Sequence, residues 1–285
     1  MKILVTGSNG QLGSELRLYS GDFPQHNFFF TDIEELDICD KKAVYDFVAL
    51  NNIELIINCA AYNAVDKAET DSTAAFELNA VAVEALCHAA KANNSFVVHI
   101  STDFVFDGQK KTPYTETDTP GPLSIYAASK FKGEEIVLNS KIPSYIIRTS
   151  WLYSSFGNNF VKTIMRLAKE KPELRVVNDQ IGSPSYARDL AEAILNMISY
   201  YTLPEKPELY HYSNEGEISW FDFAKNIVEF SALNTRVLPI SALEFNAAAK
   251  RPAYSVMDKK KIKDSFGLTI PYWEDSLKKC IELLK

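Results

Sequence analysis

The sequence has 285 residues, of which 46% are hydrophobic and 24% are charged, and its formal net charge is −7. These values are ordinary for a globular protein with a sizeable core and exclude an intrinsically disordered chain. The negative charge does not favour binding to a nucleic-acid backbone, which attracts basic surfaces. The length allows one large α/β domain with a smaller lobe, or two domains.

The four cysteines are scattered, with no CxxC pair and no metal-binding spacing; they are Cys39, Cys59, Cys87 and Cys280. This pattern predicts free thiols in a reducing compartment. The apolar run at the N-terminus is too short for a signal peptide, and no apolar stretch approaches the roughly 20 residues of a membrane span. We therefore expect a cytoplasmic protein with no membrane or nucleic-acid partner.

Short apolar runs alternate with helical patterns in the first half of the chain. Strands are predicted at residues 3–6, 28–30, 55–58, 96–101 and 145–149, and helices at 11–19, 41–50, 72–92 and 124–139. Asp40 is the predicted N-cap of the second helix, and Asp71 or Ser72 that of the third. Strands that alternate with helices form right-handed βαβ units around a parallel sheet.

The second half is less regular. Helices are predicted at 160–169, 187–199, 220–230 and 273–284, and short strands at 176–177 and 210–213. The fold class is therefore α/β, a Rossmann-type doubly wound parallel sheet with a smaller C-terminal substrate-binding lobe. We assign residues 1–150 to the sheet domain, with about 178–215 returning to it, and residues 151–285 mainly to the lobe.

A glycine-rich loop follows the first predicted strand and opens the first helix. Gly7, Gly10 and Gly13 have GxxGxxG spacing, whereas the commonest dinucleotide fingerprint is GxGxxG. Glycines permit a tight turn and bring backbone N–H groups close to a pyrophosphate, and the helix N-terminus favours negative charge. The alternative is a plain strand–turn–helix junction, but its place in a βαβ pattern favours a dinucleotide site.

Asp32 follows the second predicted strand. An acid at this point can accept hydrogen bonds from an adenosine ribose, which would favour NADH; alternatively it is a solvated acid in a turn. No arginine lies in the glycine loop or directly after the second strand to bind a 2′-phosphate. The choice between NADH and NADPH stays open at this point.

Tyr126 and Lys130 form a YxxxK sequence on a predicted helix. Positions i and i+4 share one face, so the ammonium can lie near the phenol, whose unperturbed pKa is about 10. A nearby positive charge lowers the pKa of a phenol and makes it a usable proton donor to a carbonyl oxygen. The alternative is a pair on a helix surface.

Ser101, Thr102 and Asp103 end the fourth predicted strand. The carboxyl ends of parallel strands line the ligand crevice of such folds. A hydroxyl there can donate to a substrate carbonyl oxygen beside Tyr126. Hydride transfer would belong to the cofactor, while the protein supplies orientation and the proton.

Seven further stretches carry a resemblance over nearly the whole chain. They are GSNGQLGSEL at 7–16, LDICD at 36–40, NCAAYNAVDKAE at 58–69, STDFVFDG at 101–108, RTSWLY at 148–153, DQIGSPSYARDLA at 179–191 and RPAYSVMD at 251–258. With Tyr126 and Lys130, they resemble the extended short-chain dehydrogenase/reductases, and most closely the dTDP-4-dehydrorhamnose reductase family.

The resemblance implies NADPH or NADH as cofactor. Gly10, Gln11 and Leu12 would contact its pyrophosphate and Asp37 and Ile38 its adenine. Ala61, Tyr62 and Asn63 would lie along its nicotinamide half. Thr102 would polarise the sugar ketone, Tyr126 would protonate its oxygen, and Lys130 would tune Tyr126 and hold the nicotinamide ribose.

The substrate implied by the resemblance is a nucleotide-linked sugar, dTDP-4-dehydro-L-rhamnose, reduced to dTDP-L-rhamnose. Asp103 and Trp151 would contact the sugar, and a flat indole also suits a sugar ring on physical grounds. Arg251 could bind a diphosphate through two parallel hydrogen bonds; otherwise it is an ordinary surface arginine.

Some members of this family dimerise through a metal bridged by glutamates. Glu15 matches one such position, while Arg188 falls near the other, and a guanidinium cannot ligate a cation. We therefore expect no metal, and a monomer or homodimer.

Two alternative functions remain open. One is a reductase or epimerase acting on another nucleotide sugar. The other is a non-catalytic regulatory subunit that binds a dinucleotide and a partner enzyme, although the intact Thr102, Tyr126 and Lys130 count against it.

Overall fold

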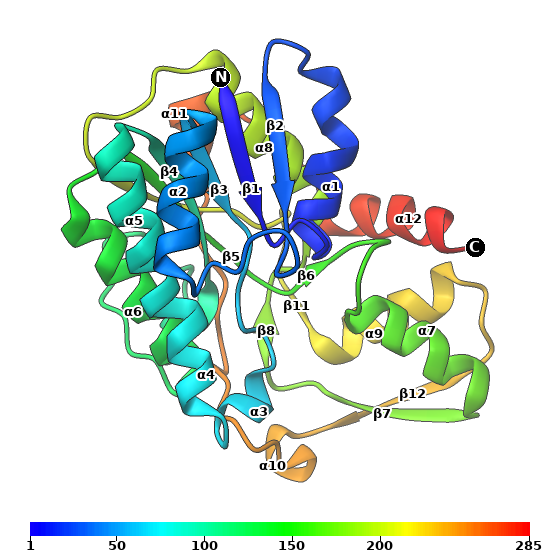
Figure 1. Cartoon of the computed structure of the whole chain (residues 1–285). Coiled ribbons are helices and arrows are strands. Elements are labelled where there is room, and N and C mark those ends of the chain that lie inside the picture. Colours follow the sequence, from blue (N-terminus) through cyan, green and yellow to red (C-terminus); the bar gives the residue numbers. More distant parts are fainter.

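A six-stranded parallel sheet forms the centre of the computed structural model, which describes residues 1–285 (Figure 1). Its strand order is β10-β5-β4-β3-β1-β2. The strands are β1 (Lys2–Thr6), β2 (Asn27–Thr31), β3 (Leu55–Asn58), β4 (Phe96–Thr102), β5 (Ser144–Thr149) and β10 (Pro207–His211). The strand order reverses between β1 and β3, which is where ligands bind in open parallel sheets. The predicted doubly wound sheet is confirmed.

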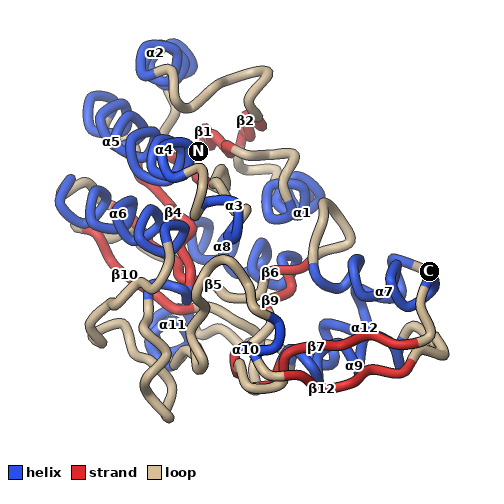
Figure 2. The backbone as a smooth tube through the Cα atoms, turned by 90° about the horizontal axis from the view of Figure 1, so that it is seen from below, coloured by secondary structure: helices blue, strands red, loops and turns tan.

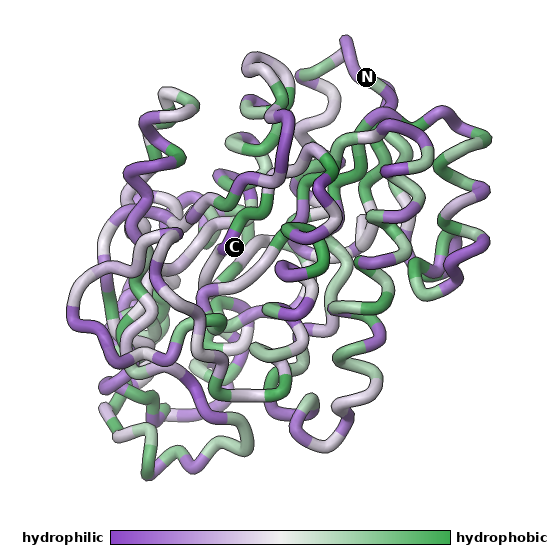
Figure 3. Tube along the Cα trace, turned by 90° about the vertical axis from the view of Figure 1, so that its left-hand side faces the viewer, coloured by the Kyte–Doolittle hydropathy of each residue, from purple (hydrophilic) through white to green (hydrophobic).

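Helices cover both faces of this sheet (Figure 2). One face carries α2 (Lys41–Asn51), α5 (Ala82–Asn93) and α6 (Ile125–Ser140), and the other carries α1 (Gln11–Tyr19), α8 (Ala187–Tyr200) and α11 (Lys260–Phe266). Green and purple alternate along the helices in Figure 3, as expected of helices that bury one side. The predicted N-cap of α2 is confirmed, because the Asp40 carboxylate accepts from the N–H groups of Lys42 and Ala43.

The strands are buried on both sides because their successive side chains enter different cores. In β1, Ile3 and Val5 join the core beneath α1 and α8, whereas Leu4 joins the core beneath α2 and α5. Such two-sided burial requires near-continuous apolar runs and explains why the strands were recognisable from the sequence.

A second lobe lies beside the sheet, at the lower right of Figure 1. It has its own apolar core. It contains α7 (Phe160–Glu170), α9 (Trp220–Phe230) and α12 (Trp273–Leu284), with β7 (Glu173–Val177) paired in parallel with β12 (Arg236–Ile240). Further short elements are β6 (Leu152–Tyr153), β8 (Ile181–Gly182), β9 (Ser185–Tyr186), β11 (Ile218–Ser219), α3 (Val65–Ala68), α10 (Ala242–Phe245), and the 3-10 turns η1 (Ser20–Asp22) and η3 (Asp103–Val105). The chain returns from the lobe to the sheet through α8 and β10.

The long helix predicted at 72–92 is interrupted. It consists of α4 (Ser72–Phe76), a π-helical segment η2 (Glu77–Val81) and α5. Asp71 occupies the N-cap position, as predicted, but makes no capping bond, because its carboxylate accepts from the Tyr62 hydroxyl at 3.1 Å. Within the π segment, the Asn79 amide bonds both the N–H and the C=O of Tyr62, at 2.8 and 3.1 Å. A π turn thus marks the place where this helix holds the loop after β3.

No helix in the structure is long and apolar enough to cross a membrane. The four cysteines are all free.

Candidate active site

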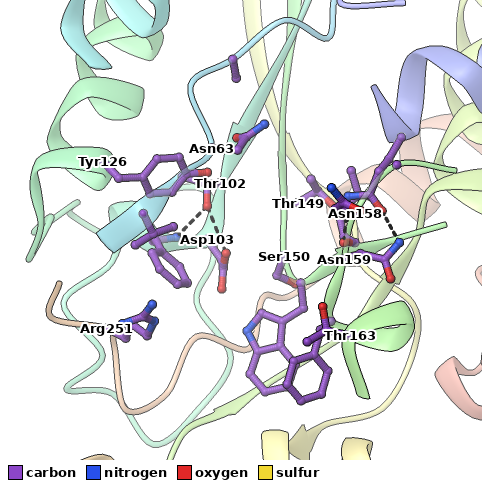
Figure 4. Close-up of a pocket in the computed structure, with 18 of the residues that line it drawn as sticks. Asn63, Thr102, Asp103, Tyr126, Thr149, Ser150, Asn158, Asn159, Thr163 and Arg251 are labelled. Carbon is purple, nitrogen blue, oxygen red and sulfur yellow. Dashed lines mark hydrogen bonds between the residues drawn. The ribbon is translucent and has the colours of Figure 1, made fainter. Parts of the chain in front are cut away.

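A cleft of about 890 Å³ is lined by residues from the sheet domain and from the second lobe. Its walls come from the loop after β1, the ends of β3, β4 and β5, the start of α6, and the lobe elements α7, β7 and α9 (Figure 4). Thirteen of the residues singled out from the sequence line it: Gly7, Gly10, Gln11, Leu12, Gly13, Ala61, Asn63, Thr102, Asp103, Tyr126, Lys130, Trp151 and Arg251. The predicted residues thus converge on one site.

The glycine loop is built for close backbone approach. Gly7 has a positive φ of 64°, and a Cβ placed there would lie 2.6 Å from the Ala60 nitrogen. A Cβ on Gly13 would lie 2.5 Å from the Gly7 carbonyl oxygen. Both positions therefore require glycine, one for its φ and both for space.

The first turn of α1 is open toward the cleft. Its N-cap is Gly10, so no side chain satisfies the first N–H groups, and those of Gln11, Leu12 and Gly13 donate to no protein acceptor. All three residues line the cleft. Unpaired N–H groups at a helix N-terminus attract an anion, so this end of the cleft fits a pyrophosphate.

Thr102 and Tyr126 lie side by side where β4 ends beside α6 (Figure 4), and Lys130 follows one turn later on the same helix. The Thr102 hydroxyl lies beside the phenol of Tyr126, and the ring of Phe104 packs edge-to-face on Tyr126 at 5.8 Å between centroids. The Lys130 ammonium donates to the Ile100 carbonyl oxygen at 2.6 Å. The Ser124 hydroxyl caps α6 by accepting from the Ala127 N–H, which fixes the start of this helix.

Burial dominates the pKa values of Tyr126 and Lys130. It raises the pKa of Tyr126 to about 12, with the Thr102 hydroxyl acting in the opposite direction, so the phenol is protonated at neutral pH. Burial also lowers the pKa of Lys130 to about 8, against the opposing effect of the Glu134 carboxylate. We predicted that Lys130 lowers the pKa of Tyr126. In this structure its ammonium is instead engaged with Ile100, and burial dominates.

Asp103 and Trp151 also line the cleft. Burial raises the pKa of the Asp103 carboxyl to about 7, although the Ser255 and Thr102 hydroxyls offset part of that effect. Trp151 has a positive φ of 48°, and its indole stacks on Trp220 with 3.5 Å between centroids and 11° between planes. Gly182 lies against the same indole, so a Cβ there would approach it to 2.6 Å. Trp151 is therefore held in a fixed orientation.

Arg251 lines the cleft and contacts Asp66 on α3. Its guanidinium donates to the two carboxylate oxygens of Asp66 at 3.1 and 2.7 Å. This ion pair joins the loop after β3 to the C-terminal segment. It also lowers the pKa of the Asp66 carboxyl.

Four residues predicted to contact the cofactor lie outside the cleft: Asp32, Asp37, Ile38 and Tyr62. Asp32 accepts from the Asn9 N–H at 2.9 Å and so supports the glycine loop. Asp37 accepts from the Cys39 N–H, and Ile38 is buried in a core. Their predicted roles at the adenosine and nicotinamide ends stay predictions.

Several further residues line the cleft and were not predicted from the sequence, namely Asn158, Asn159, Thr163, Arg175, Trp220 and Phe245. Asn159 caps α7 and donates to the Gln11 side chain at 2.9 Å, which joins the lobe to the glycine loop. An asparagine directly before a helical pattern was a signal that could have identified it. Trp220 gave no comparable signal, because its partner Trp151 is 69 positions away.

Glu15 is fully buried, accepts from the Ser154 hydroxyl at 2.6 Å and pairs with Arg188 at 3.5 Å. A guanidinium therefore occupies the surroundings where the family resemblance would place a second metal-ligating glutamate. These residues do not fit a cation site.

The doubly wound sheet, the open helix end and the Thr102–Tyr126–Lys130 set together define a member of the short-chain dehydrogenase/reductase superfamily. Within that superfamily, the chain belongs to the dTDP-4-dehydrorhamnose reductase family, and its residues 1–285 match the family model described as the RmlD substrate binding domain. The resemblance inferred from the sequence motifs is confirmed.

Among curated proteins, the dTDP-4-dehydrorhamnose reductase of Aggregatibacter actinomycetemcomitans is 39% identical, with 97% of each chain covered. The spore coat polysaccharide biosynthesis protein SpsK of Bacillus subtilis is 37% identical, with 99% of this chain and 97% of the relative covered. Among solved structures, a dTDP-4-dehydrorhamnose reductase of Bacillus anthracis in complex with NADP superposes with a TM-score of 0.93 at 39% identity, covering 99% of this chain and 98% of that one.

Proposed function

We propose that this protein reduces the 4-keto group of dTDP-4-dehydro-L-rhamnose to dTDP-L-rhamnose with NADH or NADPH. The observation that carries the proposal is the convergence of Thr102, Tyr126 and Lys130 with the open first turn of α1 in one cleft. Support comes from relatives named for this reaction that match the chain over nearly its full length, and from one of them solved with NADP.

The open N–H groups of Gln11, Leu12 and Gly13 would bind the cofactor pyrophosphate, and Ala61 and Asn63 would flank its nicotinamide half. When bound, the cofactor supplies the hydride that adds to the ketone carbon. Trp151 and Asp103 would orient the sugar so that its carbonyl oxygen lies between the Thr102 and Tyr126 hydroxyls.

Proton transfer is the protein's own chemical contribution. As negative charge develops on the ketone oxygen, the Thr102 hydroxyl stabilises it and Tyr126 donates its phenolic proton to it. A pKa of about 12 suits this role, because Tyr126 carries its proton at neutral pH and the nascent alkoxide is a far stronger base. Lys130 would hold the nicotinamide ribose and stabilise the phenolate left after the transfer.

The test is the oxidation of NADH and NADPH, followed at the nicotinamide absorbance, with the ketone generated in situ from dTDP-glucose by the two preceding enzymes. Oxidation only with the complete ketone-generating system would establish the reductase, and the relative rates would give the cofactor preference. No oxidation by folded protein that still binds a dinucleotide would favour another nucleotide sugar or the regulatory-subunit function.

We further propose that the protein works in the cytoplasm, as a monomer or a homodimer. Four free cysteines suit a reducing compartment. Size-exclusion chromatography with light scattering would distinguish the two assemblies.

A further inference from the structure

Glu134 is a buried carboxylate one helical turn beyond Lys130 on α6, and its exposed fraction is 0%. Its oxygens are fully engaged. Oε1 accepts from the Ser101 hydroxyl at 2.5 Å and from Arg148 Nε at 2.8 Å, and Oε2 accepts from the second guanidinium arm of Arg148 at 2.7 Å. A bidentate ion pair inside the sheet–helix interface is costly to bury unless hydrogen bonds satisfy both carboxylate oxygens, as they do here.

These contacts place Glu134 on the same face of α6 as the proton-transfer residues. Tyr126, Lys130 and Glu134 are spaced four residues apart and therefore lie on one face of α6. That face meets the end of β4: Tyr126 lies beside Thr102, Lys130 donates to Ile100, and Glu134 accepts from Ser101.

Arg148 extends the same connection to the next strand. It lies on β5 as the register partner of Ser101, and Thr149 is likewise the partner of Thr102. Glu134 therefore ties α6 to two adjacent strands at the level of the catalytic hydroxyls. This connection determines how far along the sheet Tyr126 and Lys130 lie.

Burial lowers the pKa of Lys130, and the nearby Glu134 carboxylate opposes that shift. Lys130 is 3% exposed, and its ammonium lies near the Cys59 thiol, the neutral imidazole of His99 and the Glu134 carboxylate. Asp103 acts on the pKa of Tyr126, and His211, whose pKa burial lowers to about 3, contacts Arg148. Glu134 is thus the carboxylate that acts on Lys130, and it favours the protonated ammonium.

We propose that Glu134 is a positioning residue for the Tyr126–Lys130 pair. Held by Arg148 and Ser101, it fixes the position of α6 along the sheet and keeps Lys130 charged. The inference rests on the proposed function, because Glu134 does not line the cleft and acts only through residues that do, such as Ser101.

The experiment compares the wild type with the double variant Glu134→Gln/Arg148→Gln. This variant removes both buried charges, so neither partner remains as an unpaired ion. We expect kcat at mildly alkaline pH to fall by about tenfold or more, and the alkaline limb of the kcat/KM profile to move down by about one pH unit, since Lys130 loses its proton earlier. An unchanged alkaline limb in a folded variant, even with a lower melting temperature, would overturn the proposal and leave Glu134 a purely structural residue.

Glu135→Gln is the matched control. It removes the same charge from the adjacent position of α6, where the Glu135 side chain is 40% exposed and pairs with Lys132. We expect its pH profile and kcat to equal those of the wild type. An equal shift in this control would show that net charge, and not the buried contact, moves the limb.

A second variant, Ser101→Ala, covers the case in which the double variant does not fold. It keeps both charges and removes only the hydroxyl that ties Glu134 to β4. We expect a several-fold lower kcat with an unchanged alkaline limb, and an unchanged kcat would contradict the positioning role.

NADPH affinity, measured by nicotinamide fluorescence across the same pH range, separates this proposal from the proposed function. In the double variant, the loss of affinity on the alkaline side should begin at lower pH than in the wild type. This shift is measurable even if the protein turns over no dTDP-sugar, so failure of the reductase assay would leave the inference about Glu134 testable. Coincident binding curves would contradict it.

Discussion

The Arg251 guanidinium and the Asp66 carboxylate form two hydrogen bonds, of 3.1 and 2.7 Å, although 185 positions separate them in the chain. Asp66 lies on α3, just after the loop that holds Asn63, and also accepts from the Ala249 N–H at 3.0 Å. Asp66 therefore holds the planar guanidinium of Arg251 in a fixed orientation at the cleft. A guanidinium held in this way suits the binding of a diphosphate.

Replacement of Arg251 by alanine tests this function. We expect KM for the nucleotide sugar to rise by roughly tenfold or more, since a charge-assisted hydrogen bond contributes about 1.5–3 kcal/mol. The value of kcat should change less, because Arg251 is not among the residues proposed to act on the reacting carbonyl. Steady-state kinetics measures both parameters. Arg236→Ala, an exposed arginine of the same lobe, is the control, and equal KM values for the two variants would exclude Arg251 from substrate binding.

Tyr126→Phe should lower turnover by a factor of about 100 or more, since general acid catalysis contributes on this scale. The ring keeps its packing on Phe104, so the fold and the dinucleotide affinity should persist. Stopped assays of product formation, combined with NADPH titration, measure the two effects separately. Turnover near that of the wild type would mean that another group donates the proton.

The pH profile should report Lys130. Its pKa is lowered to about 8 by burial, so kcat/KM of the free enzyme should fall as the pH rises through this value and the ammonium is lost. Lys130→Arg carries a permanent charge and should lack this fall, although its different shape should lower the overall rate. If the same alkaline limb persisted in Lys130→Arg, its origin would lie in a different group.

Gly13→Ala should destabilise the protein by about 1–3 kcal/mol, because its Cβ would overlap the Gly7 carbonyl oxygen and the Ser8 backbone. The displaced loop should also bind NADPH more weakly. Gly21→Ala is the control, since a Cβ there meets nothing within 4 Å, and its effect should stay within about 0.5–1 kcal/mol of zero. Urea denaturation and fluorescence titration test the pair. Equal stability of both variants would argue against close packing in the glycine loop.

The sequence by itself determined the parts of this protein that depend on local patterns. Strands buried on both sides have uninterrupted apolar runs, so β1 and β3 could be predicted from the sequence. The amphipathic helices α9 and α12 begin and end at the predicted residues. The glycine loop and the spacing of Tyr126 and Lys130 were readable for the same reason, because each lies within one element or one turn.

Only the tertiary structure decided which distant residues meet. The stacking of Trp151 on Trp220, the pairing of Arg251 with Asp66 and the buried contact of Glu134 with Arg148 each join different elements of the fold. Such contacts form when packed layers exclude water. Their energy depends on burial and on geometry, and the spacing of apolar residues along the sequence predicts neither. The protonation of Tyr126 belongs to the same class, since burial of the phenol, and not its spacing from Lys130, dominates its pKa.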